Sequence, residues 1–234
     1  MREGVPVHKI LLSSSVALAL GTLSSISHAA DSATFSVTGT ISPTSCDVSL
    51  SAEKFDFGSI SAATLTAMHN EKTGSAVNLN VNCDAATALA IQTTDNRASS
   101  AMTGAEMEAA MATITSLDDT SLFGLGTDSD SNKIGVMLLV VSNAALNGAV
   151  SSNLLTSDDK AAWSTHAISL TSPFPVAKNS YFALASDAGS TVPAAATSVS
   201  YTLRPGIILK RADKYPGGET VNIDGNVTFS LVYL

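Results

Sequence analysis

Charged and aromatic side chains are scarce in this sequence of 234 residues, at 14% and 5% of the total. The chain also has only two cysteines, four histidines and one tryptophan. So few histidines and cysteines argue against a metal site or a histidine-driven general base. Acidic residues outnumber basic ones by 20 to 12, which makes nucleic acid and anionic lipid poor partners. The apolar content of 45% is that of a packed protein, not of a disordered tail.

The N-terminal residues resemble a cleaved secretory signal. Arg2 and Lys9 precede a mostly apolar stretch over residues 10–23, and Ser27-His28-Ala29 places small residues two apart, as signal peptidase requires. The apolar stretch is about half the length that a spanning helix needs, so a membrane anchor is the weaker interpretation. We therefore expect residues 1–29 to be removed, leaving 10 basic and 19 acidic residues.

The two cysteines, Cys46 and Cys83, both lie in the expected mature chain. In an oxidising compartment an isolated pair most simply forms one disulfide. A redox pair or a set of metal ligands needs closer spacing or further ligands. Closing this loop is expected to stabilise the fold by about 4 kcal/mol.

Short alternating segments separated by turn residues predict strands far more often than helices. One helix is expected at Gly104–Thr113, inside a long insertion from about Asp95 to Asn132. Short strands separated by turns are typical of an antiparallel, immunoglobulin-like β-sandwich. The expected strands are Ala33–Ile41, Lys54–Phe57, Ala76–Cys83, Leu89–Thr93, Lys133–Ser142, His166–Leu170, Tyr181–Ser186, Ser198–Arg204 and Thr220–Tyr233.

Both ends of the mature chain carry the clearest alternation. Residues 34–42 alternate small polar side chains with Phe35, Val37, Gly39 and Ile41, so one face of the strand is apolar and the other is all Ser and Thr. Such a strand needs a hydrophobic trough, in the same molecule or in a neighbouring one. At the C-terminus Phe229, Leu231 and Tyr233 share a face, and a strand there must stop at a sheet edge or beside a gap.

Together these features resemble the pilins that are assembled by the chaperone/usher pathway. The resemblance rests on residues 30–41 followed by Cys46, on the Phe-Gly segment Lys54–Ile60, and on Tyr233 at the penultimate position with Phe229 four residues before it. It covers both ends of the chain and the cysteine pair, but not the middle.

The resemblance implies an all-β fold, an incomplete immunoglobulin-like sandwich completed by donor-strand exchange. Residues 30–42 would be the donor-strand extension and 43–234 the pilin domain of a fimbrial subunit at the cell surface. The donor residues would be Phe35, Val37, Gly39 and Ile41, and Phe229, Leu231 and Tyr233 would line or border the acceptor groove and be recognised by the chaperone. The implied partners are a periplasmic chaperone, an outer-membrane usher and other pilin subunits, with no cofactor, metal, nucleic acid or membrane anchor.

The sequence departs from that family in two places. Pilins of this pathway commonly have glycine fourteen residues from the C-terminus, where this chain has Val221 between Gly218 and Gly225. The mature chain is also longer, with the surplus around residues 95–163.

Two other classes of function compete with the fibre subunit. A carbohydrate-binding adhesin of the two-domain kind would place its lectin domain before the pilin domain, whereas this chain begins with the extension. A secreted enzyme is disfavoured because titratable groups form no recognisable arrangement and no Gly-x-Ser-x-Gly segment is present.

Two local patterns have simpler explanations than a ligand site. Residues 128–132 begin like a calcium loop, but Lys133 and Leu139 replace the glycine and the glutamate that such a loop needs, so a solvated turn is expected. His166, close to Trp163, is expected to lie in a partly buried aromatic corner.

Overall fold

The computed structural model describes residues 34–41, 43–111 and 117–234, and the chain divides into a unit ending at Ile41 and a unit that begins at Ser42. In the first unit, residues 34–41 form no helix or strand, and Phe35, Val37 and Ile41 are exposed. The expected signal peptide at 1–29, the first mature residues 30–33 and Ser42 lie outside the described residues.

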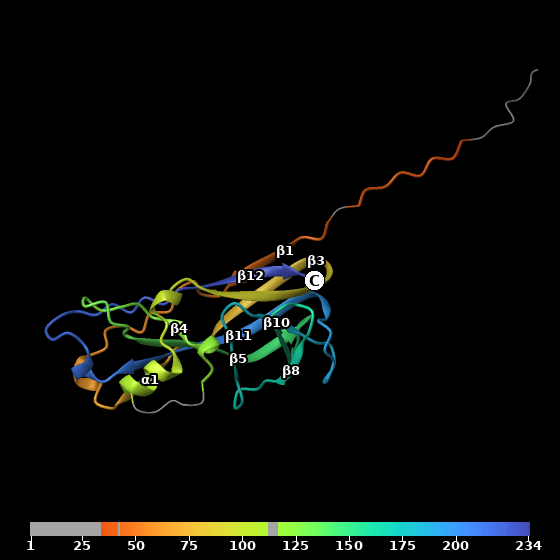
Figure 1. The fold of residues 1–234 in the computed structure, drawn as a ribbon. Helices are drawn as coiled ribbons and strands as arrows, with labels where there is room; N and C mark the ends of the chain where they lie inside the picture. Colours follow the sequence, from red (N-terminus) through yellow and green to blue (C-terminus); the bar gives the residue numbers. More distant parts are fainter. Residues whose placement is uncertain (1–33, 42, 112–116) are drawn as a thin grey trace, which may run out of the picture. The chain divides into compact units, whose positions relative to one another are not determined.

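The second unit is mostly β, with one short α-helix, α1 (Gly104–Met111), and four single-turn 3₁₀ helices in its described part (Figure 1). The all-β prediction is confirmed at this level. The 3₁₀ turns are η1 (Ala62–Thr64), η2 (Ala98–Ser100), η3 (Asp119–Ser121) and η4 (Ala212–Lys214). The strands are β1 (Cys46–Leu50), β2 (His69–Thr73), β3 (Val77–Asp95), β4 (Phe123–Gly124), β5 (Gly135–Leu146), β6 (Ala149–Ser151), β7 (Asn153–Ser157), β8 (Ser164–Ala167), β9 (Phe174–Pro175), β10 (Tyr181–Leu184), β11 (Ala195–Lys210) and β12 (Val227–Tyr233).

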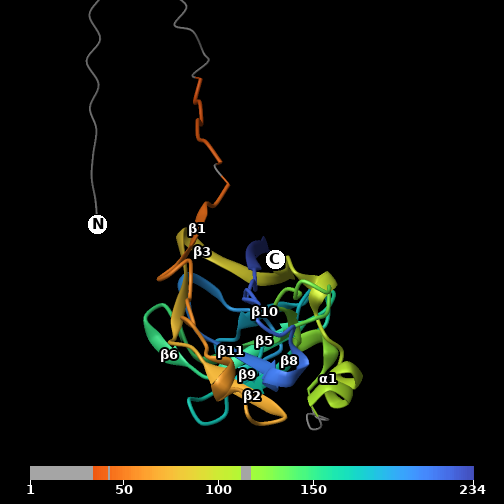
Figure 2. The same ribbon diagram turned by 90° about the vertical axis from the view of Figure 1, so that its left-hand side faces the viewer.

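All strand pairs are antiparallel, and they form one curled sheet whose main order is β4-β5-β11-β3-β10-β7-β8. Figure 2 shows the strands curling around a common interior. The long strand β3 joins the two halves, because residues 77–88 pair with β11 and residues 91–92 pair with β10. Leu79 and Ile91, from the two parts of β3, both belong to the main core cluster, although the register with β11 shifts between Asn82 and Thr87.

The strands β1 and β12 follow one another along the same edge of β3. Cys46–Leu50 pairs with residues 79–83, opposite β11, and Val227–Tyr233 pairs with residues 89–95, opposite β10. Within the described chain, neither β1 nor β12 has a partner on its outer edge. This side of the sheet therefore presents unpaired backbone groups, which a further strand can pair with.

Four clusters of buried apolar residues lie in the described part of the second unit, and the smallest of them contains Ala90, Leu155, Ala183 and Ala185. The main cluster occupies the interior at the centre of β3, β5 and β11, with Phe182 and Tyr201 in edge-to-face contact at 4.8 Å between ring centroids. Toward the end of β11, Ile207 and Leu209 continue this interior, whereas Ile208 points to the opposite face. There α1 covers it with the fully buried Met107 and Met111.

The expected elements were partly right. Two expected strands, Ala76–Cys83 and Leu89–Thr93, are one strand, so Cys83 lies inside β3 and does not end a strand. The expected strand Lys54–Phe57 does not form, because no backbone in the described chain lies beside it to complete a ladder. The helix ends at Met111, and Thr113 lies outside the described residues.

The range expected for the extra length relative to pilins, residues 95–163, was too broad. Strand β5 pairs with β11 over eleven positions and β7 pairs with both β10 and β8, so both are integral to the sheet. What lies outside the main strands is chiefly the stretch between β3 and β5, which contains α1.

Candidate functional site

A groove of about 680 Å³ lies at the end of β11. Its floor includes Leu65, Ile134 and Leu209, which are nearly inaccessible and belong to the same interior cluster as Ile207. The groove therefore opens onto the hydrophobic core. Its walls also contain apolar or aromatic side chains: Phe55, Phe57, Ile60, Tyr215, Val221 and Ile223.

Two segments without regular structure form the long sides of the groove. They are residues 54–60, which follow β1, and residues 216–223, which lead into β12. Within the described chain neither segment makes a backbone-to-backbone hydrogen bond. Polar backbone groups beside an apolar floor are the features that an added β-strand satisfies.

The first side of the groove is shaped by Phe55. A Cβ placed on Gly74 would lie 2.8 Å from the Phe55 ring and 2.8 Å from the Pro205 ring. The Phe55 ring therefore lies directly against Gly74. Phe57 meets Phe55 edge to face, with 4.7 Å between ring centroids. Glycine at position 74 is thus what allows the Phe55 ring to occupy this place.

Tyr215 closes the end of the groove near β11. Its hydroxyl donates to the carbonyl oxygen of Ile134 at 2.7 Å and accepts from the backbone N–H of Lys210 at 2.9 Å. Burial raises the pKa of Tyr215 to about 12. The Lys210 ammonium lies 4.9 Å from the Tyr215 ring centroid, and burial lowers its pKa. This end is held by neutral hydrogen bonds and a cation–π contact.

The residues expected at an acceptor groove do not line this one. Phe229 and Leu231 are partly buried against the main core, and Tyr233 is about half exposed. The groove lies before them in the chain, because its second side leads directly into β12. Their recognition by a chaperone stays a prediction.

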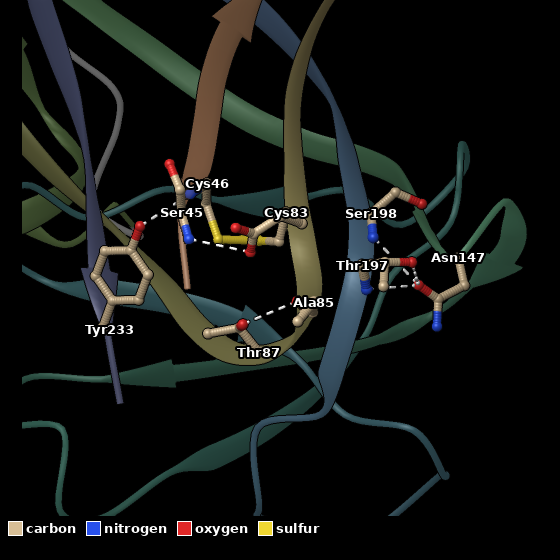
Figure 3. The surroundings of a disulfide bond; sticks show 10 residues. Ser45, Cys46, Cys83, Ala85, Thr87, Asn147, Thr197, Ser198 and Tyr233 are labelled. Carbon is tan, nitrogen blue, oxygen red and sulfur yellow. Dashed lines mark hydrogen bonds between the residues drawn. A yellow bond between two sulfur atoms is a disulfide. The ribbon is translucent and has the colours of Figure 1, made fainter. Parts of the chain in front are cut away.

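The disulfide between Cys46 and Cys83 is confirmed, and it joins β1 to β3 (Figure 3). Next to it, the Tyr233 hydroxyl accepts a hydrogen bond from the backbone N–H of Cys46 at 3.1 Å. The end of the C-terminal strand is therefore tied to the start of β1.

The expected donor residues Phe35, Val37, Gly39 and Ile41 all lie in the first unit. The three apolar side chains are exposed, and a Cβ placed on Gly39 would have no described atom within 4 Å. They are thus unburied in the single chain, and their role as a donor strand stays a prediction.

Sequence reasoning missed most of the groove. Phe55 and Phe57 were noticed only as part of a family-like segment, and Val221 only as a departure from the family. The available signal was their alternation with exposed residues on both sides of the groove.

The other local patterns are structural. Residues 129–132 form the expected exposed turn, whereas Asp128 at its start is buried, and one of its oxygens accepts hydrogen bonds from the backbone N–H groups of Asp130 and Asn132. The described residues contain no group of three His, Cys, Asp or Glu side chains placed to hold a metal ion. The His166 ring packs on Phe174, with 4.0 Å between centroids, so the partly buried aromatic corner is formed with Phe174. Over the described ranges, no helix has the length and hydropathy needed to cross a membrane.

Comparison with known proteins places the chain in a family. A family described as "Protein of unknown function (DUF1120)" matches residues 35–137, so the match starts at Phe35 and extends into β5. The protein from Escherichia coli (strain K12) named "Uncharacterized protein YhcF" is 30% identical over 246 aligned positions, which cover 97% of this chain and 98% of YhcF. The chain belongs to the family of YhcF. Since the similarity spans nearly the full length of both proteins, this membership covers the groove together with the segment that precedes Cys46.

Proposed function

We propose that this member of the YhcF family is a structural subunit of a cell-surface fibre that polymerises by strand donation. The observation that carries the proposal is the groove, whose floor is formed by apolar residues of the core and whose two long sides have unpaired backbone groups in the described chain. An incoming strand supplies apolar side chains that pack on the floor. Its backbone supplies hydrogen-bonding partners for the two sides.

The segment around Phe35–Ile41 matches this groove in length and pattern. Seven residues in a strand span about 20 Å, and residues 54–60 on one side of the groove are also seven. Burying Phe35, Val37 and Ile41 on the floor would contribute roughly 1.5–3 kcal/mol each. The intervening Ser and Thr side chains would face solvent.

Donation from one copy to the next is a head-to-tail contact, and such a contact generates a filament when it does not close on itself. On this proposal the sheet of the second unit is an incomplete immunoglobulin-like sandwich, and the donated segment is its missing strand. The resemblance to chaperone/usher pilins then supplies the remaining partners, namely a periplasmic chaperone that covers the groove before assembly and an outer-membrane usher. The fibre is exported through the periplasm to the cell surface.

The experiment compares two neighbouring substitutions in the chain that starts at Ala30. Val37→Asp places a charge on the face expected to be buried, whereas Thr38→Asp places the same charge on the face expected to be solvated. Both side chains are exposed in the single chain, so neither substitution disturbs the core. Sedimentation should give polymers for the wild type and for Thr38→Asp, and monomers for Val37→Asp.

A second arm uses a chain that starts at residue 43, which keeps both cysteines and every residue of the core clusters. It should bind a synthetic peptide of residues 30–42 and fail to bind the peptide carrying Val37→Asp. A stable monomer that ignores the unchanged peptide, or equal polymerisation of the two aspartate variants, would rule out strand donation.

A further inference from the structure

The second side of the groove, residues 216–223, continues through residues 224–226 to β12, and this whole stretch, 216–226, is held in place by the part of the chain between β3 and β5. We call this part the clasp and define it as residues 96–111 and 117–132, which include the two-residue strand β4. The segment 216–223 has no backbone partner of its own in the described chain. Its course therefore depends on contacts with the clasp.

Contacts join the clasp to three positions along the stretch 216–226. The Arg97 guanidinium donates to the Asp224 carboxylate at 2.7 Å, and the backbone N–H of Asp224 donates to the carbonyl oxygen of Leu125 at 2.9 Å. The Asn226 carbonyl accepts from the backbone N–H of Asn96 at 3.0 Å. Further out, the Ser129 hydroxyl donates to the Glu219 carboxylate.

Gly126 places the clasp beside the groove side at ordinary contact distance. Its φ of 98° lies in the region that favours glycine, and a Cβ there would lie 3.7 Å from the carbonyl oxygen of Asn222. The contact thus continues between the polar attachments at Glu219 and Asp224.

The clasp is itself firmly attached to the sheet. The buried carboxylate of Asp95 accepts from the backbone N–H groups of Arg97 at 2.8 Å and Gly124 at 2.9 Å. On the outer face, the fully buried Met107 and Met111 pack in one cluster with Ile208. The clasp therefore offers a fixed base to a segment that has no ladder.

We propose that the clasp pre-forms the groove, with Arg97 as a positioning residue that holds the stretch 216–226 open for the incoming strand. This rests on the proposed function, since it assigns the clasp a part in accepting the donated segment. A side that is already ordered loses less conformational entropy when a strand is added, so insertion is faster. The clasp thereby raises the rate of assembly although it does not contact the donated strand.

The test uses the chain that starts at Ala30 and carries Val37→Asp, so that its own segment is disabled and a labelled peptide of residues 30–42 is the sole donor. Arg97→Ala is compared with Arg211→Ala. The Arg211–Asp213 pair has the same 2.7 Å separation and similar exposure, but is local to η4 and makes no ion pair with residues 216–226. The double variant Arg97→Asp with Asp224→Arg restores the pair in reverse.

Two measurements separate the inference from the function. Hydrogen exchange at the Asp224 amide should accelerate in Arg97→Ala, and peptide association should slow about two- to fivefold, the range expected for one exposed ion pair. Arg211→Ala should match the parent in both measurements, and the reversed pair should recover most of the association rate. Global unfolding should change equally in the two alanine variants.

Absence of peptide binding to every variant, the parent included, would overturn the proposed function and this inference with it. Peptide association at the parent rate in Arg97→Ala would overturn the inference alone. So would unchanged exchange at Asp224.

Discussion

The hydroxyl of Tyr233 accepts a hydrogen bond from the backbone N–H of Cys46, with 3.1 Å between the two heavy atoms. These residues are far apart in sequence, yet Tyr233 ends β12 and Cys46 begins β1. Because both strands pair with the same edge of β3, the bond closes the gap between them along that edge. The disulfide at Cys46 fixes the same point to β3.

Tyr233→Phe should remove this bond and leave the ring in place. We expect a loss of about 0.5–1 kcal/mol in the free energy of unfolding, at the lower end for a hydrogen bond because Tyr233 is half exposed. Urea titration followed by circular dichroism measures it. Tyr215→Phe is the comparison, since that hydroxyl makes two backbone hydrogen bonds and is more deeply buried, and it should cost more. A greater loss in Tyr233→Phe than in Tyr215→Phe would contradict the expectation that burial strengthens these bonds.

The disulfide should dominate the stability of β1. The strand has five residues and only partly buried core contacts at Cys46 and Leu50. Replacing both cysteines with serine should lower the free energy of unfolding by about 4 kcal/mol through the entropy of the opened loop. Denaturant unfolding of the double variant and of the reduced wild type should agree, and a loss below about 1 kcal/mol in both would show that the disulfide is not the main constraint.

Gly74→Ala should disturb the groove from outside its lining. The new Cβ would meet the Phe55 ring and the Pro205 ring, both at 2.8 Å, and neither ring can yield by a simple bond rotation at its tip. We expect a loss of about 1–3 kcal/mol from overpacking. Gly217→Ala is the matched control, because a Cβ there has nothing within 4 Å, and it should change stability by less than about 0.5 kcal/mol. Calorimetry measures the change in stability of each variant.

The long alternating strands were predictable because their pattern and their partners agree. Around β11, for example, the apolar residues of the expected strand Ser198–Arg204 face the core, and the structure only lengthens the element at both ends. The short strand β1 was missed, although its apolar Cys46, Val48 and Leu50 alternate with Asp47 and Ser49, because a five-residue alternation is a weak signal by itself. The disulfide and the ladder with β3 decide its structure, and a local pattern contains neither.

The hollow at the end of β11 is lined by residues other than those expected at an acceptor groove, for a related reason. The alternation of Phe229, Leu231 and Tyr233 predicted a lining face, but in the folded chain β3 provides a neighbour and the first two side chains pack on the core. The alternation of Phe55 and Phe57 predicted a strand, but no neighbour exists for it in the described chain. Sequence periodicity gives the face of a strand; only the tertiary fold says whether the chain supplies the partner.

His166 should make the protein less stable in mild acid. Burial lowers its pKa below the ordinary value, because the ring packs on Phe174 and its Nε2 lies 2.9 Å from the Thr156 hydroxyl. The unfolded chain therefore binds the proton more readily, and this contribution to stability, complete above about pH 7, declines as pH falls through about 6.5. Urea unfolding at about pH 7.5 and 5.5, on either side of that value, should show a smaller decrease for His166→Gln than for the wild type. Equal decreases in the two proteins would contradict the assignment.

Gly39 is the remaining position of the apolar face in residues 34–42, and it tests how closely the donated strand approaches its groove. If the strand inserts with this face down, Gly39 lies where the floor is shallow or the backbones come close. Gly39→Leu should then slow assembly on the order of tenfold, since overpacking of about 1–3 kcal/mol raises the barrier to insertion. Thr40→Leu adds the same side chain to the solvated face and should assemble at nearly the wild-type rate. Light scattering of chains starting at Ala30 measures both rates, and unchanged assembly of Gly39→Leu would remove Gly39 from the contact surface while leaving Phe35, Val37 and Ile41 to carry it.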